Sequence, residues 1–297
     1  MTSMALAESG DVLLTASTDC TARLWDLREG SCVGICRGHT RAIPTATFLQ
    51  GGEEGRLATV SGDGSFRLWG GPHAACTQTV DWDSGAINLG RLVRTKGSGS
   101  VLATCHWDMK RDVSRLLLWD VQEGGMGWVD KKLRSHAGHF EGFNGRITCL
   151  DCLAGASDDA PSLLAAGATD GIARLFELGA SDALGSGGMQ LELAPPGEAA
   201  HAASVTCVAF CRAAGAEDAW LLAVGRSDGR VDVWGGEEDG EVELKATRLV
   251  CTADAEDGRR SVSKVEWKRA GDGPTGAIFL WASAARTLRK WRLESAL

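Results

Sequence analysis

The stretch LLTASTDCTARLWD at residues 13–26 decides the fold because it returns along the chain. Close copies are RLATVSGDGSFRLW at 56–69, LLAAGATDGIARLF at 163–176 and LLAVGRSDGRVDVW at 221–234. Each copy has the pattern of an alternating strand, a tight turn and a second strand that ends on an aromatic residue. Weaker copies lie at 101–120 and 279–291. The chain is therefore a series of repeats of one unit that contains a hairpin.

One aromatic residue closes each copy: Trp25, Trp69, Trp119, Phe176, Trp234 and Trp291. Successive anchors are 44 to 58 residues apart, and self-similarity on this scale is typical of repeat architectures. Such units bury their faces only against their neighbours. The pattern is similar to that of WD-repeat β-propellers. This resemblance implies an all-β fold with about six four-stranded antiparallel blades.

The repeats predict one domain over residues 1–297, with approximate blades at 1–37, 38–83, 84–137, 138–200, 201–253 and 254–297. Aligned to the others, the first blade begins inside its inner strand, and the last ends soon after its third strand. Members of this family commonly complete the last blade with an N-terminal segment. We therefore expect an incomplete last blade with an open edge. A clasp strand or a seventh blade would belong to a longer parent chain.

The second repeat has four residues that match the family's hydrogen-bonded tetrad: His39, Ser61, Asp63 and Trp69. The resemblance implies that Ser61 holds the Trp69 indole N–H and contacts His39, which Asp63 orients. A buried indole N–H needs a partner, and a closed polar network supplies one. Without the repeats, three of these residues resemble a catalytic Ser/His/Asp set. Their repeat-defined positions favour the structural interpretation.

The other repeats keep only part of this set. The turn acid recurs as Asp170 and Asp228, but the serine position holds Ala168 and Arg226. The third repeat has CHWDMKRD at 105–112 in place of a regular turn, for which we expect a long exposed connection. We expect these blades to be held mainly by apolar packing.

Composition narrows the class of protein. The chain is 44% hydrophobic and 24% charged, with a formal net charge of −8, and this acidic balance argues against general nucleic-acid binding. No run approaches the roughly 20 apolar residues of a membrane span, and the first ten residues lack the features of a secretory signal. We expect a cytoplasmic or nuclear protein that does not bind membranes.

Ten cysteines raise the question of disulfides or zinc. Cys149 and Cys152 are three apart in a strand pattern, so they point to opposite faces. Cys32 and Cys36 share a face but lie about 13 Å apart along a strand. We expect reduced, mostly buried thiols and no metal. Phosphate-loop, dinucleotide, HExxH and GxSxG motifs are absent from the sequence, so it predicts neither a cofactor nor catalytic residues.

Two sets of residues are candidates for partner binding. Arg41, Asn144, Arg146 and Arg226 are expected near the top face and channel mouth. The first interpretation is a non-enzymatic interaction scaffold or adaptor that presents these loops to peptides or proteins. An enzyme with a channel-mouth site is a remote alternative, because no general base or nucleophile lies beside these residues.

A second interpretation depends on Arg28. The stretch WDLR at 25–28 resembles the WDxR box of substrate receptors that dock on the damaged-DNA-binding adaptor of cullin-type ubiquitin ligases. Trp25 belongs to the blade core whatever the function, so only Arg28 adds information.

The last repeat is basic, whereas the whole chain is acidic. Nine Lys or Arg lie between Arg259 and Arg292, against only Glu266 and Asp272. This charge is consistent with an ordinary exposed blade face or with a docking patch for an acidic partner.

Overall fold

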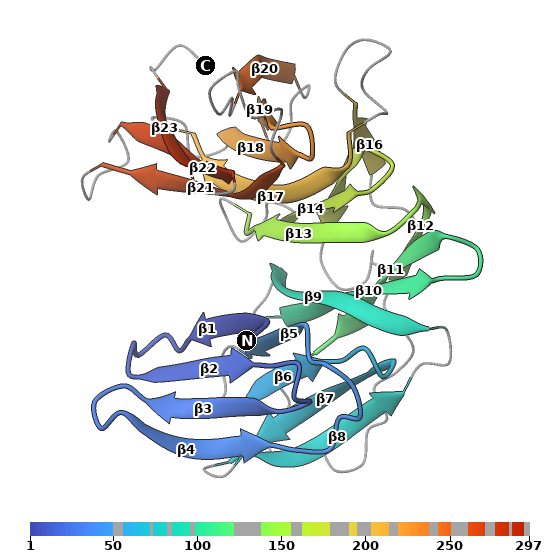
Figure 1. Ribbon diagram of the computed structural model, residues 1–297, viewed down its shortest axis with the longest axis vertical. Coiled ribbons are helices and arrows are strands. Elements are labelled where there is room, and N and C mark those ends of the chain that lie inside the picture. The colour runs from blue at the N-terminus through green and yellow to red at the C-terminus, as the bar shows by residue number, and fades with distance from the viewer. Residues whose placement is uncertain are drawn as a thin grey trace. The chain divides into compact units, whose positions relative to one another are not determined.

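The structure is a computed structural model in which the regular elements are β-strands (Figure 1). It describes residues 1–49, 56–71, 74–81, 85–95, 99–121, 138–155, 162–178, 190–194, 203–213, 219–237, 243–250, 261–270, 277–284 and 287–293. Across these ranges, no helix is long and apolar enough to cross a membrane.

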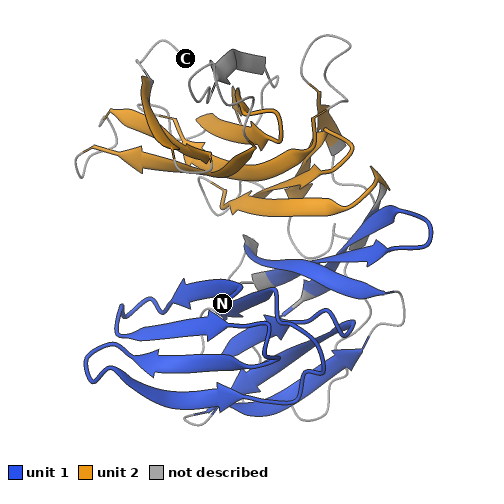
Figure 2. Cartoon of the chain, in the orientation of Figure 1, with its two compact units in different colours: residues 1–142, 184–186 blue, residues 143–183, 187–297 orange. Residues whose placement is uncertain are grey.

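The chain divides into two compact units, shown in different colours in Figure 2. Unit 1 comprises residues 1–142 and 184–186, and unit 2 comprises 143–183 and 187–297. The single domain over residues 1–297 stays a prediction.

The first two sheets of unit 1 are antiparallel meanders of four strands in chain order. The first contains β1 (Ser3–Leu6), β2 (Val12–Ala16), β3 (Ala22–Asp26) and β4 (Ser31–Cys36). The second contains β5 (Thr45–Phe48), β6 (Leu57–Val60), β7 (Ser65–Gly70) and β8 (Ala75–Asp81). Both follow the strand, turn and strand pattern of the repeats.

The third sheet differs from its predicted boundaries. It contains β9 (Ala86–Thr95), β10 (Gly99–Asp108), β11 (Val113–Asp120) and β12 (Gly138–Asn144), with β12 beside β11. The predicted boundary between 137 and 138 is therefore wrong, because residues 138–144 complete this sheet. Gly145, at φ +106°, separates β12 from the next strand, and this conformation is readily available only to glycine.

The prediction of a long exposed connection at 105–112 is also wrong. Strand β10 continues to Asp108 and pairs with Val113 at the start of β11, so only four residues form the turn. Cys105 and His106 are buried in the strand. Because these residues continue the alternation of strand β10, the irregular sequence lengthens the hairpin formed by β10 and β11.

Unit 2 contains two four-stranded sheets and one three-stranded sheet. The fourth sheet of the chain is β13 (Ile147–Leu153), β14 (Ser162–Ala168), β15 (Ala173–Leu178) and β16 (Gln190–Leu193). The fifth is β17 (Val205–Arg212), β18 (Ala219–Arg226), β19 (Arg230–Glu237) and β20 (Glu243–Val250). The last is β21 (Val262–Arg269), β22 (Ile278–Ala284) and β23 (Thr287–Leu293).

Six sheets of this kind confirm the predicted all-β blades, with the last sheet incomplete in the described residues. Apolar side chains fill the space between consecutive sheets within each unit. In unit 1, for example, Leu14 and Leu24 of the first sheet share a buried cluster with Leu57 and Trp69 of the second. Burial of this apolar area is the main stabilising contribution.

Where neighbouring sheets meet, a glycine of one sheet packs against a valine of the next. A Cβ on Gly167 would lie 2.3 Å from Val205 Cγ1, and one on Gly225 would lie 2.9 Å from Val262 Cγ1. In the second and third sheets the sizes are exchanged, because Val60 of β6 packs against Gly90 of β9. The sheets therefore approach closely wherever one partner lacks a side chain, as close packing requires.

Candidate functional site

A tryptophan on the third strand of each sheet in unit 1 donates to a threonine on the second strand. The indole nitrogens of Trp25, Trp69 and Trp119 lie 2.9, 2.8 and 2.7 Å from the hydroxyls of Thr15, Thr59 and Thr104. In each case the threonine is two residues beyond the one paired with the tryptophan. The two side chains therefore lie on the same face of their sheet.

In the second sheet this pair extends into a longer network. Thr59 Oγ1 lies 2.8 Å from His39 Nε2, and His39 Nδ1 lies 3.0 Å from Asp63 Oδ2. Because an ionised carboxylate only accepts, Nδ1–H donates to Asp63, and Nε2 accepts from the Thr59 hydroxyl. The Ser65 hydroxyl donates to Asp63 at 2.7 Å. Trp69, His39 and Asp63 are thus connected through a threonine.

The implied role of Ser61 is wrong. Its hydroxyl donates to the carbonyls of Arg41 and Ala42 at 3.0 and 3.2 Å, and it accepts from the Asp63 amide. Trp69 is paired with Leu57, so at about 3.3 Å per residue Thr59 is about 7 Å along the strand and Ser61 about 13 Å. Only Thr59 is within reach of the indole. The missed signal was a threonine ten residues before the tryptophan in both of the first two repeats.

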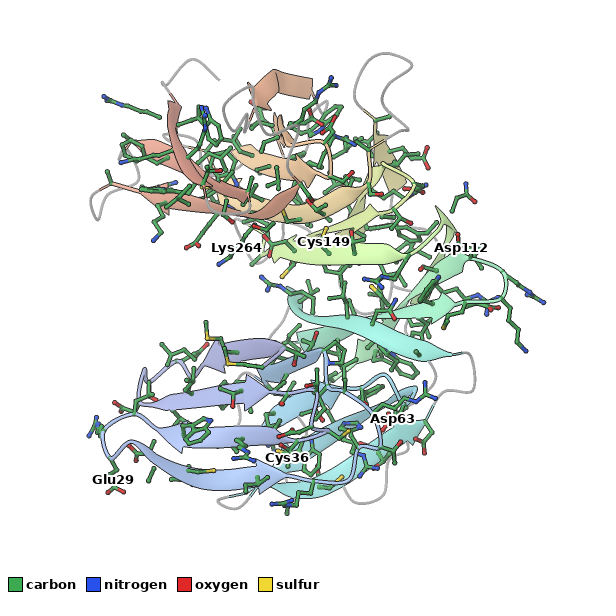
Figure 3. All side chains as sticks on the ribbon, in the orientation of Figure 1. Glu29, Cys36, Asp63, Asp112, Cys149 and Lys264 are labelled. Atoms are coloured by element: carbon green, nitrogen blue, oxygen red, sulfur yellow. The ribbon has the colours of Figure 1, made fainter. Side chains whose placement is uncertain are left out.

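The surroundings of His39 and Asp63 fix their protonation at neutral pH. Burial lowers the pKa of His39, although Asp63 partly offsets this effect. Burial opposes ionisation of Asp63, but hydrogen bonds from Ser65, Thr40 and His39 outweigh it and hold its pKa well below the usual range. The pair is a neutral imidazole and a carboxylate, both oriented by the sheet. Asp63 is labelled in Figure 3.

The third sheet contains a shorter version of this network. His106 Nε2 lies 3.0 Å from Thr104 Oγ1, and the side chain is 2% exposed. Its Nδ1 is buried without a hydrogen-bond partner. Burial, and to a smaller extent the charge of Arg115, lowers the pKa of His106 to about 4. A neutral histidine inside the strand replaces the loop histidine of the second sheet.

Unit 2 lacks these threonines and contains buried ion pairs. Val224 of the fifth sheet stands where a threonine would, two residues beyond the partner of Trp234, and the indole nitrogen of Trp234 is unsatisfied. In the fourth sheet, Arg174 Nη1 lies 2.8 Å from Asp170 Oδ2. Replacing a threonine with an apolar residue leaves the indole without an acceptor.

Arg226, a predicted partner-binding residue, has an internal role. It is 2% exposed, and its Nε lies 2.5 Å from Asp232 Oδ2. Its Nη1 donates to the carbonyls of Gly171 and Ala203 at 2.7 and 3.4 Å. The guanidinium therefore connects the fourth and fifth sheets and is not presented to a partner.

Arg41, Asn144 and Arg146 are exposed, and each lies just before the inner strand of a sheet. Backbone hydrogen bonds hold these segments to the turns between the second and third strands. The Gly62 amide donates to Ala42 O, and the Thr169 amide donates to Arg146 O, both at 2.9 Å. The structure places Arg41 in unit 1 and Asn144 and Arg146 in unit 2. Their backbones are fixed, while their side chains reach solvent.

Arg28 lies in the turn after β3. Its guanidinium makes a two-point ion pair with Asp11, at 2.9 and 2.8 Å, and its side chain is 76% exposed. Asp26 Oδ1 accepts from the backbone amides of Arg28 and Glu29 and shapes the turn. Hydrogen bonds from these amides lower the pKa of Asp26. The side chain of Arg28 is thus accessible, but it is engaged within its own sheet.

The nine cysteines in the described residues are free thiols. Burial raises the pKa of Cys36 and of Cys149 to about 12, so both are protonated at neutral pH. Within the same residues, no group of three His, Cys, Asp or Glu could hold a metal ion.

Comparison with known proteins supports the repeat assignment. Residues 1–26 and 30–70 match the family described as WD domain, G-beta repeat. The F-box/WD repeat-containing protein sel-10 of Caenorhabditis elegans is 36% identical over 95 residues, which are 32% of this chain and 16% of that protein. The WD repeat-containing protein pop1 of Schizosaccharomyces pombe is 48% identical over 44 residues, 15% of this chain and 6% of that protein.

A third relative is the Denticleless protein homolog of Gallus gallus, 37% identical over 57 residues, which are 19% of this chain and 8% of that protein. Each of these three matches spans 16% or less of the relative's own length. Residues 1–26 and 30–70 match WD repeats, and the resemblance to the WD-repeat family is confirmed.

Proposed function

We propose that this protein is a non-enzymatic scaffold or adaptor, cytoplasmic or nuclear, that binds peptide or protein partners. One observation carries the proposal. The buried ionisable groups His39, Asp63 and Arg226 all have internal partners, whereas the exposed Arg41 and Arg146 extend from segments fixed to the turns. A rigid frame with exposed cations at the strand ends is suited to binding.

The fold alone does not specify a partner, so the test uses these side chains. Proteins cross-linked to the wild-type chain in cells are compared with those cross-linked to Arg41→Ala and Arg146→Ala, with Arg111→Ala as the exposed control. We expect a defined partner to be lost in Arg146→Ala, with or without a loss in Arg41→Ala, and to be retained in the control. Unchanged partners in all three variants would overturn the proposal.

A second candidate function is substrate receptor of a cullin-type ubiquitin ligase, through residues Trp25 to Arg28. The exposure of Arg28 supports it. Because Asp11 already holds the guanidinium, an adaptor would have to displace Asp11 or share Arg28 with it. Asp11→Asn should therefore strengthen adaptor binding, and Arg28→Ala should abolish it. Equal binding by both variants would exclude the box.

The remaining alternative, a propeller enzyme, is weakened by Arg226. That residue was part of the proposed channel-mouth set, but its guanidinium lies in a buried ion pair with Asp232. Such a pair is costly to separate, because each charge would be left uncompensated.

A further inference from the structure

β23 is the outer strand of the last sheet in the part of the chain that the structure describes. In the described residues no strand pairs with the far side of β23, whereas each of the other five sheets has a fourth strand there. The backbone donors and acceptors at a sheet edge are a template for the addition of another strand. This edge therefore has the geometry to receive an extended segment.

The face of the sheet at this edge is basic. Strand register places Leu288, Lys290 and Arg292 of β23 on one face, beside Ser283, Trp281 and Phe279 of β22. Lys264 and Lys268 of β21 lie on the same face, and Lys264 is labelled in Figure 3. Its one acid, Glu266, lies 3.1 Å from Lys264 and 3.9 Å from Lys268. A negative partner suits this face.

The aromatic residues of this face favour a peptide over a nucleic acid. Lys290 Nζ lies 3.8 Å from the centroid of the Phe279 ring and 5.2 Å from that of Trp281. Single-stranded nucleic acids need open aromatic faces on which bases stack, but the lysine already covers these rings. The exposed ammonium remains available to a carboxylate.

Unit 2 contains an internal example of the same chemistry. In the fourth sheet, the outer strand β16 has the sequence QLEL, and the Oε1 of its one acid, Glu192, lies 3.1 Å from Arg174 Nε on the neighbouring strand β15. Leu193, one residue further, is buried. An outer strand that places a carboxylate beside an arginine of the third strand, next to a buried leucine, therefore completes this sheet.

We propose that the open edge of β23 binds an extended acidic segment of a partner protein, which adds to the last sheet as a fourth strand. Its backbone pairs with β23 as in other cases of strand addition. The carboxylates of the added segment lie beside Lys290 and Arg292. Its alternate, apolar residues lie on the opposite face, beside Trp291, which packs against the buried cluster of this sheet. This inference rests on the proposed scaffold function and names the chemistry of one partner.

The test measures binding of a labelled synthetic peptide of alternating Glu and Leu by fluorescence anisotropy. A peptide with Lys in place of Glu tests charge, and one with N-methyl groups at alternate residues tests backbone pairing. We expect the first peptide to bind and both controls to fail. Charge reversal by Lys290→Glu with Arg292→Glu should weaken binding by about tenfold or more, about 1.4 kcal/mol. Lys110→Glu with Arg111→Glu, in an exposed turn, should have little effect.

Hydrogen exchange locates the bound peptide. The amides of Leu288 to Arg292 should become protected when the peptide is added. No binding to the wild-type protein, equal weakening by both pairs of charge reversals, or binding that survives N-methylation would overturn the inference. So would β23 amides already protected as well as those of β22 in the free protein. If this inference is overturned but cross-linked partners still depend on Arg41 or Arg146, the proposed scaffold function still holds.

Discussion

Replacing Thr59 with valine tests the polar network of the second sheet. Valine keeps the shape of the side chain but removes the hydroxyl that bonds Trp69 Nε1 and His39 Nε2, both at 2.8 Å. Both partners are buried, with exposures of 3% and 6%, so water does not replace the lost bonds. Each buried polar group left unsatisfied costs about 1–3 kcal/mol. We expect Thr59→Val to lower the free energy of unfolding by about 2–4 kcal/mol.

Two variants are matched controls. Thr15→Val removes the equivalent hydroxyl from the first sheet. There Trp25 is only half-buried, and no histidine bonds to the threonine. We therefore expect the free energy of unfolding to fall by about 1 kcal/mol or less. Ser61→Ala removes a hydroxyl that donates to the Arg41 and Ala42 carbonyls and accepts from the Asp63 amide, and it should cost about 1–2 kcal/mol. Urea denaturation followed by tryptophan fluorescence and by circular dichroism measures all three. If Ser61→Ala destabilised more than Thr59→Val, the assignment of the hydroxyl would be refuted.

Three further predictions concern packing, the unsatisfied indole and pH. Gly167→Ala should cost about 1–3 kcal/mol through overpacking, measured by urea denaturation and partly rescued by Val205→Ala, because the new Cβ would lie 2.3 Å from Val205 Cγ1. Val224→Thr should stabilise by about 1 kcal/mol by giving Trp234 Nε1 an acceptor; a lower denaturation midpoint would contradict this. The folded-state pKa of His106 is about 4, lowered by burial from its ordinary value of 6.5, so the unfolded chain binds the proton first and stability falls as pH drops from 6.5 to 4. His106→Gln should flatten this part of the stability–pH curve, and an unchanged slope would contradict the assignment.

The sequence predicted the blades well because their signal is repeated. An alternating strand, a turn acid and an aromatic anchor recur at 13–26 and 56–69, and each is stabilised locally by the strand and turn that contain it. The blade boundary at 137 was wrong because the sequence between β11 and β12 has no repeat signal, so a strand that ends the third sheet was assigned to the fourth.

The polar contacts were harder to predict because they depend on register. Thr59 lies in β6 and Ser61 just after its end, and only the pairing of Leu57 with Trp69 decides which of them reaches the indole. The Arg226–Asp232 pair crosses between strands that meet at a turn, so a residue that looked exposed from its loop position is buried. Arg41 and Arg146 are exposed, and their role in partner binding stays a prediction.

The central claim is that buried polar groups hold the sheets while exposed turn residues bind the partner, so stability and binding should separate. The most direct measurement compares partner cross-linking and the urea midpoint for Arg146→Ala and Thr59→Val. We predict that Arg146→Ala loses the partner at an unchanged midpoint, because an exposed substitution changes stability by no more than about 0.5 kcal/mol. Thr59→Val should lower the midpoint and retain the partner below its unfolding transition. Loss of the partner only in proportion to the loss of stability, in both variants, would contradict the claim.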